Sequence, residues 1–104
     1  MSFLARRQQA FETMFVHEEA MRFRVRARRN KALAKWAAEM MKLSEVDANS
    51  YLETIIAVAV EAGMDEAVVK RVGTDLAMVG FAISYEQVRA QMDLFTTEAE
   101  RSFS

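Results

Sequence analysis

The side chains that perform most enzyme chemistry are scarce in this chain. It has one histidine, His17, and no cysteine, which excludes thiolate nucleophiles and thiolate metal ligands. His17 is followed by Glu18 and Glu19, but adjacent residues on a helix point to different sides, so we interpret His17 as a surface histidine and expect no metal site. The chain also lacks a glycine-rich phosphate loop and a notable Ser-His-Asp spacing. The sequence therefore predicts a protein that is not an enzyme and acts by binding another protein.

Basic residues between positions 22 and 35 are the strongest charge feature. At 100° per residue, Arg22, Arg26 and Arg29 share the azimuth of the apolar residues that follow them on the same helix. Those apolar residues are Leu33, Trp36 and Met40. The opposite side, which we expect to be a solvated face, carries Arg24, Arg28, Lys31 and Lys35.

Two interpretations of the first three arginines stay open. Residues 1–38 hold nine Arg and Lys against three Glu, whereas residues 39–104 hold five against twelve acidic residues. The arginines therefore either lie over acidic residues of the later helices or, with Glu18 and Glu19, recognise a partner.

An apolar but discontinuous segment precedes the basic run. Phe11 and Phe15 are spaced i, i+4, and Leu4 lies further upstream, next to Arg6 and Arg7. This segment is either additional core or a mobile arm that orders only on binding, by laying a short apolar helix in a groove.

Helix-boundary signals divide the chain into four helices. Ser44 with Asp47, and Ser84 with Gln87, are N-terminal capping patterns. Gly63 and Gly80 are stop signals, Asp65 is a candidate cap, and Gly73 inside a helix suggests close packing. We expect helices over 5–42, 45–62, 66–79 and 85–101, each with an apolar stripe. Ile56, Val79 and Tyr85 belong to the stripes of the second, third and fourth helix, respectively.

The first helix is too long for its companions. Residues 5–42 would extend roughly 57 Å at 1.5 Å per residue, about twice the length of any other helix. We therefore predict an all-α fold: a four-helix bundle with a flexible N-terminal arm leading into a long first helix. The chain has no apolar run of 18 residues, and a cytoplasmic location is expected.

The segment from about Ala10 to Leu43 contains a dense series of motifs: Phe11-Glu12, Phe15, His17-Glu18-Glu19, Arg22-Phe23-Arg24, Ala27-Arg28-Arg29-Asn30-Lys31 and Trp36-Ala37-Ala38-Glu39. With these motifs the segment resembles the zeta subunit family of alphaproteobacterial F-type ATP synthases, which are small ATPase inhibitors. The resemblance continues more loosely through Ala82, Ser84, Gln87 and Arg89.

The resemblance implies an inhibitory arm at residues 1–19 and a four-helix bundle at residues 20–104. In that family the arm enters a catalytic interface of the ATP synthase head and contacts the central shaft, so that hydrolytic rotation is blocked while synthesis is spared. The protein would then lie at the cytoplasmic face of the inner membrane when bound, without inserting into it. The candidate partner-binding residues are Leu4, Arg6, Arg7, Phe11, Phe15, Glu18, Glu19, Arg22, Arg26 and Arg29.

The start of the arm departs from the family pattern. Members usually carry an acidic Phe-Asp-Asp-Arg sequence, whereas this chain has Phe3-Leu4-Ala5-Arg6-Arg7. Docking on a site built for the opposite charge is expected to be weaker.

The alternative function is binding of nucleic acid or nucleotide by the basic face of the first helix. Phosphate-backbone contacts suit the run from Arg22 to Lys35, but the acidic remainder of the chain repels a polyanion. No cofactor is expected, and weak adenine-nucleotide binding by the arginines stays open.

Overall fold

The computed structural model describes the backbone of residues 3–103 and the side chains of residues 18–103. The helices are α1 (Phe3–Met40), α2 (Glu45–Ala62), α3 (Asp65–Met78) and α4 (Tyr85–Ser102). Residues 3–103 contain no strand, so the all-α class and the four-helix architecture are confirmed. The last three helices begin and end within one residue of their predicted bounds.

Side-chain caps and a left-handed glycine set the ends of these helices. The Ser44 hydroxyl accepts a hydrogen bond from the Asp47 backbone N–H at 3.2 Å, and Gly63 has a φ of 65° at the end of α2. Ser84 and Gln87 form the predicted capping box, with side chain to backbone distances of 2.8 and 3.1 Å. These contacts satisfy backbone groups that a helix end leaves unpaired.

Two local predictions are wrong. Asp65 does not cap α3, because it is the first residue of the helix and Met64 occupies the cap position, without a side-chain cap. The Asp65 carboxylate accepts hydrogen bonds from Arg29 instead. Close packing does not explain Gly73 either. A Cβ added there would lie 3.9 Å from Val88 Cγ2, which is an ordinary van der Waals distance.

The hydrophobic core lies where α1 packs against the other three helices, in the last third of α1. Burial of these apolar side chains supplies the main driving force for folding. The fully enclosed residues are Leu33, Ala34, Ala37, Ile55, Val68, Val69, Val72, Leu76, Val88 and Met92.

Three residues predicted on the apolar stripes are exposed. Ile56 is 45% exposed because its neighbour Ile55 takes the inward direction of α2. Val79 (53% exposed) follows the last residue of α3, and Tyr85 (39% exposed) is the first residue of α4, so both lie at helix ends outside the enclosed core.

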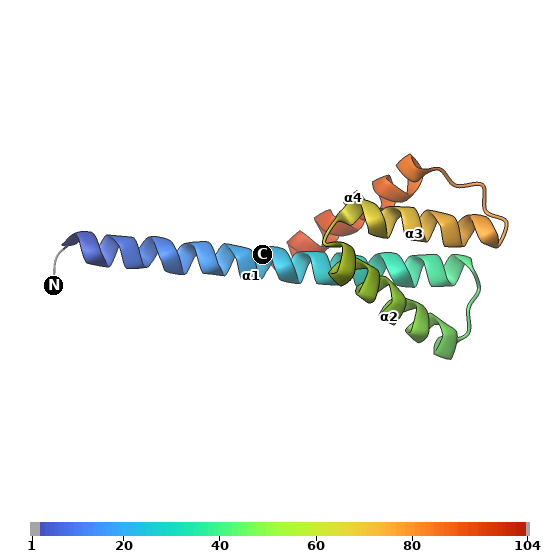
Figure 1. The fold of residues 1–104 in the computed structure, drawn as a ribbon, viewed down its shortest axis with the longest axis horizontal. Helices are drawn as coiled ribbons and strands as arrows, with labels where there is room; N and C mark the ends of the chain where they lie inside the picture. Colours follow the sequence, from blue (N-terminus) through green and yellow to red (C-terminus); the bar gives the residue numbers. More distant parts are fainter. Residues whose placement is uncertain (1–2, 104) are drawn as a thin grey trace.

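Helix α1 runs well past the bundle, as its predicted length required (Figure 1). Its 38 residues correspond to about 57 Å of helix, and the molecule measures 64 × 28 × 25 Å. Along the described part of α1, the first buried side chain is that of Arg29. The predicted mobile arm covers residues 1–19. Apart from Glu18 and Glu19, the side chains of this segment lie outside the described residues.

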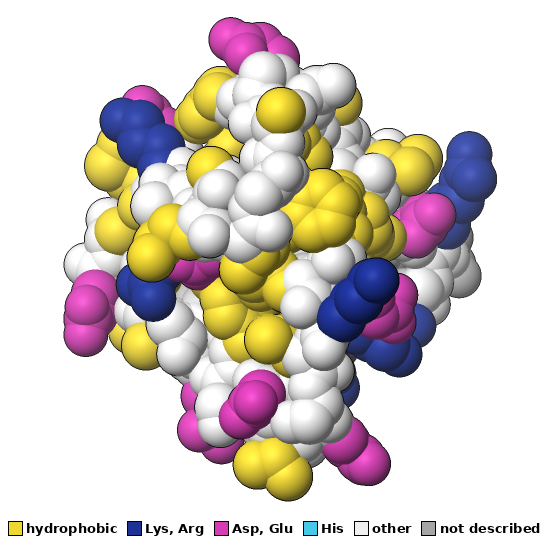
Figure 2. Space-filling view, turned by 90° about the vertical axis from the view of Figure 1, so that its right-hand side faces the viewer, with side chains coloured by type: hydrophobic (Ala, Val, Ile, Leu, Met, Phe, Trp, Pro, Cys, Tyr) yellow, Lys and Arg dark blue, Asp and Glu magenta, His cyan; other side chains and the backbone are white. Residues whose placement is uncertain are grey.

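The opposite end of the bundle carries exposed hydrophobic side chains. Figure 2 looks onto this end, where hydrophobic side chains gather at the centre and charged ones surround them. Met78 (80% exposed) ends α3, and Phe81 (37% exposed) lies in the loop that follows. The two ends of the molecule therefore differ: one is a projecting helix and the other an apolar end face.

Candidate docking site

The part of α1 that leaves the bundle carries exposed charges on Glu18, Glu19 and Arg22. Arg22 Nη1 lies 3.6 Å from Glu19 Oε1, one turn earlier on the helix, and the two side chains remain 70% and 51% exposed. An exposed ion pair of this kind contributes roughly 0–1 kcal/mol. Both side chains can therefore exchange this contact for one with a partner at little cost to the fold.

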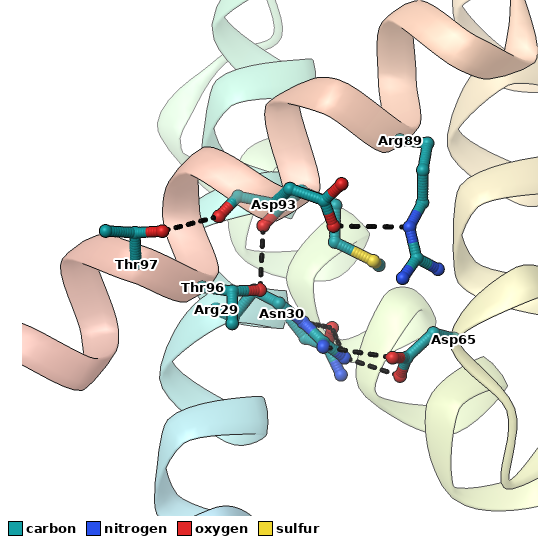
Figure 3. A network of polar contacts seen from close by, with 8 residues as sticks. Arg29, Asn30, Asp65, Arg89, Asp93, Thr96 and Thr97 are labelled. Carbon is teal, nitrogen blue, oxygen red and sulfur yellow. Dashed lines mark hydrogen bonds and ion pairs between the residues drawn. The ribbon is translucent and has the colours of Figure 1, made fainter.

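Arg29, which is on the same predicted azimuth, is in a different situation. Its side chain is 5% exposed and donates two hydrogen bonds to the Asp65 carboxylate, at 2.7 and 3.1 Å. It also donates to the Asn30 side-chain oxygen at 3.1 and 3.2 Å. Figure 3 shows this two-pronged contact, which joins α1 to the first residue of α3. The guanidinium group is thus fully engaged within the chain.

The electrostatics of Asp65 follow from this contact. The hydrogen bonds from Arg29 hold the pKa of the Asp65 carboxyl below its usual value, partial burial opposes the shift, and the positive charges of Arg29, Arg89 and Arg26 add to it. A charge-assisted, two-pronged pair of this kind fixes orientation as well as adding binding energy. The pair therefore sets the position of α1 against the turn between α2 and α3.

The structure separates the three arginines that the sequence grouped together. Arg29 follows the first of the two interpretations, because it pairs with Asp65, an acidic residue of α3. Arg22 and Arg26 are exposed and stay available to a partner. Leu4, Arg6, Arg7, Phe11 and Phe15 have side chains outside the described residues, so their predicted roles remain proposals.

Sequence reasoning missed two features of this region. Asn30 is buried and accepts from Arg29, yet an isolated asparagine in a basic helix gives no signal of burial. Lys31 and Lys35 are exposed, as predicted, but the prediction did not include the groove that they line together with Phe23. The signal for this groove was available: an aromatic residue stands among the cations, on a helix whose core stripe points elsewhere.

The described part of the chain contains neither a metal-binding cluster nor a helix suited to span a membrane. Residues 18–103 hold no group of three or more histidine, cysteine or acidic side chains placed to bind a metal ion. The His17 side chain lies outside the described residues. No described helix is long and apolar enough to cross a membrane.

No curated protein and no solved structure matches this chain. The family model described as ATPase inhibitor subunit zeta matches residues 1–102, which is nearly the whole chain. The four helices, the long leading helix and the resemblance found in the sequence agree with that match. The chain belongs to the family of ATPase inhibitor zeta subunits.

Proposed function

We propose that this protein inhibits ATP hydrolysis by binding the catalytic head of an F-type ATP synthase through residues 1–19. The family is one of regulatory inhibitor subunits and not of catalytic ones. The observation that carries the proposal is the projection of α1 beyond the bundle (Figure 1). A helix that projects from its own fold can enter an interface of another protein while the bundle remains outside.

The apolar anchors of the proposal are Phe11 and Phe15, with Leu4 upstream. Residues spaced i, i+4 lie on one helix face, so both phenylalanine rings can enter the same groove of a partner. Full burial of each ring contributes on the order of 1.5–3 kcal/mol. If the segment orders on binding, that ordering costs roughly 2–5 kcal/mol, which keeps the inhibitor releasable.

The charges at the base of the arm supply orientation. Glu18, Glu19 and Arg22 are exposed where α1 leaves the bundle, and Arg26 is exposed one turn further on. Charges at the rim of an interface mainly raise the association rate and suppress wrong partners. Arg29 is left out of the proposed contact set, because its guanidinium group is buried against Asp65.

The test is ATPase inhibition of the purified catalytic head by the full-length protein and two variants. Phe11→Ser with Phe15→Ser should abolish inhibition, since it removes both anchors. The matched control is Met78→Ser with Phe81→Ser, which changes two exposed hydrophobic residues at the far end of the bundle and should leave inhibition intact. Full inhibition by the Phe11 and Phe15 variant, or by a protein lacking residues 1–19, would remove the arm from the mechanism.

The basic start of the arm gives a second test of the same proposal. Arg6→Asp with Arg7→Asp restores the acidic character that is usual in the family. If the partner site is built for acidic residues, this variant should inhibit at a lower concentration than the natural sequence does. Weaker inhibition by the variant would show that the site accepts the basic arm, and the argument from charge would be wrong.

A further inference from the structure

A groove separate from the arm runs along the bundle. It has a volume of about 910 Å³ and lies between α1, from Phe23 to Lys35, and the second half of α2. On its walls Phe23 is 67% exposed, Val60 76% and Met64 59%. Exposed apolar side chains gathered in one groove are typical of an interaction surface.

Cations border this apolar surface along one side. The lining residues from α1 include Arg26, Arg28, Lys31 and Lys35, all exposed. Among residues 18–103, Lys31 and Lys35 have no ion-pair partner. The acidic residue in the lining is Asp65, and Arg29 already neutralises its charge. The groove therefore combines an apolar wall with uncompensated positive charge.

The C-terminal end of the chain places an aromatic ring beside the positive wall. The guanidinium carbon of Arg28 lies 5.8 Å from the centre of the Phe103 ring, within the range of a cation–π contact. Phe103 also lines the groove. This contact favours a position of the exposed Arg28 charge beside the groove, which lowers the entropy cost of using it in recognition.

We infer that this groove binds an amphipathic helix of another protein, one whose apolar stripe is flanked by acidic residues. From Phe23 to Lys35 the wall measures about 18 Å, enough for about three turns of a docked helix. Leucine-like side chains at i, i+3 and i+4 would cover Val60 and Met64. Glutamate or aspartate on the flank would meet Lys31 and Lys35.

The geometry argues against two other occupants. A small molecule is usually enclosed over most of its surface, whereas the apolar side chains named above are each more than half exposed. A nucleic acid would engage the cations but leave the α2 wall uncovered, with its exposed Val60 and Met64. An acidic amphipathic helix uses both walls together.

The experiment measures binding of designed, fluorescently labelled helical peptides to the full-length protein by anisotropy. One peptide carries leucine at helical spacing with flanking glutamates, and a second has lysine in place of every glutamate. The glutamate peptide should bind and shift the amide resonances of Val60 and Lys31, and the lysine peptide should bind at least about tenfold more weakly. Equal binding of the two, or no binding of either, overturns the inference.

Two matched pairs of variants locate the site. Val60→Ser should weaken binding of the glutamate peptide several-fold, whereas Val46→Ser should not, although both valines lie on α2 and are 76% and 74% exposed. Lys31→Glu with Lys35→Glu should weaken it about tenfold or more. The control, Lys42→Glu with Lys70→Glu, changes the net charge equally outside the groove and should have little effect. The assignment would be refuted if a groove variant and its control lost the same peptide affinity. It would also be refuted if the protein self-associated through this face.

The inference does not depend on the inhibitory arm, and the two can fail separately. The Phe11→Ser and Phe15→Ser protein should lose ATPase inhibition and keep peptide binding. The Val60→Ser protein should bind the glutamate peptide several-fold more weakly, whatever the outcome of the inhibition assay. Failure of one readout alone therefore identifies which of the two proposals is wrong.

Discussion

The pair between Arg29 and Asp65 predicts a large loss of stability when Asp65 is replaced by alanine. The substitution removes two charge-assisted hydrogen bonds and leaves a guanidinium group that is 5% exposed with only Asn30 as a partner. Breaking a fully buried pair costs roughly 3–5 kcal/mol. Because the Asp65 side chain is 37% exposed and water can enter after the substitution, we expect a loss of about 2–4 kcal/mol.

Glu66→Ala is the matched control for this prediction. Both acidic residues lie in the first turn of α3, so both favour its N-terminus, but Glu66 pairs with Lys70 at an exposed site. Glu66→Ala should cost less than about 1 kcal/mol. The difference between the two variants isolates the contact with Arg29.

The assay is urea unfolding followed by circular dichroism, with thermal unfolding as a second readout. A loss of about 2–4 kcal/mol corresponds to a fall in Tm of roughly 10–20 °C for a domain of this size. The double variant Arg29→Met with Asp65→Ala should lose less than the sum of the two single variants, because it leaves no buried charge. If Asp65→Ala unfolds within about 0.5 kcal/mol of Glu66→Ala, the pair does not hold α1 against α3 as argued.

Three further predictions concern the same unfolding measurement. The lowered pKa of Asp65 means that its contribution to stability is complete above about pH 5 and is lost as the pH falls below about 4, so acid should destabilise the natural protein more than Asp65→Ala. Gly73→Ala should stabilise the protein by roughly 0.5–1 kcal/mol, since the added Cβ has room beside Val88; a lower Tm would show a clash. Ser84→Ala should cost about 1 kcal/mol by removing the capping box with Gln87, and an unchanged Tm would contradict that role.

Sequence reasoning succeeded where the relevant physics is local. Ser44 and Ser84 mark helix starts because a hydroxyl that accepts from the third following residue needs no tertiary context. Gly63 marks a helix end for the same reason, since only its own φ is involved.

The end of α1 shows what local patterns leave out. The helix stops at Met40, followed by Lys42 in the left-handed region at φ 57°, with the Leu43 N–H donating to the Ala38 carbonyl at 3.0 Å. This termination is usually marked by glycine, so the sequence carried no signal for it.

The different fates of Arg22 and Arg29 could not be predicted from helical geometry. Both lie on one azimuth of α1, and periodicity alone treats them alike. What separates them is height along the axis: the first turn of α3 meets α1 at the level of Arg29 and brings Asp65 to it, whereas Arg22 stands two turns outside. That height depends on how the later helices pack, which is a tertiary property.

This arrangement separates stability from recognition along a single helix. From Leu33 onward, inward-facing residues of α1 are enclosed by the core, and Arg29 closes that region by its contact with Asp65. Glu19 and Arg22 form an exposed ion pair outside this region. Their substitution should therefore leave the free energy of unfolding almost unchanged, because exposed pairs contribute little. The stretch of α1 before Arg29 can then change its charge, as the basic start of this chain does, without loss of the fold that holds it.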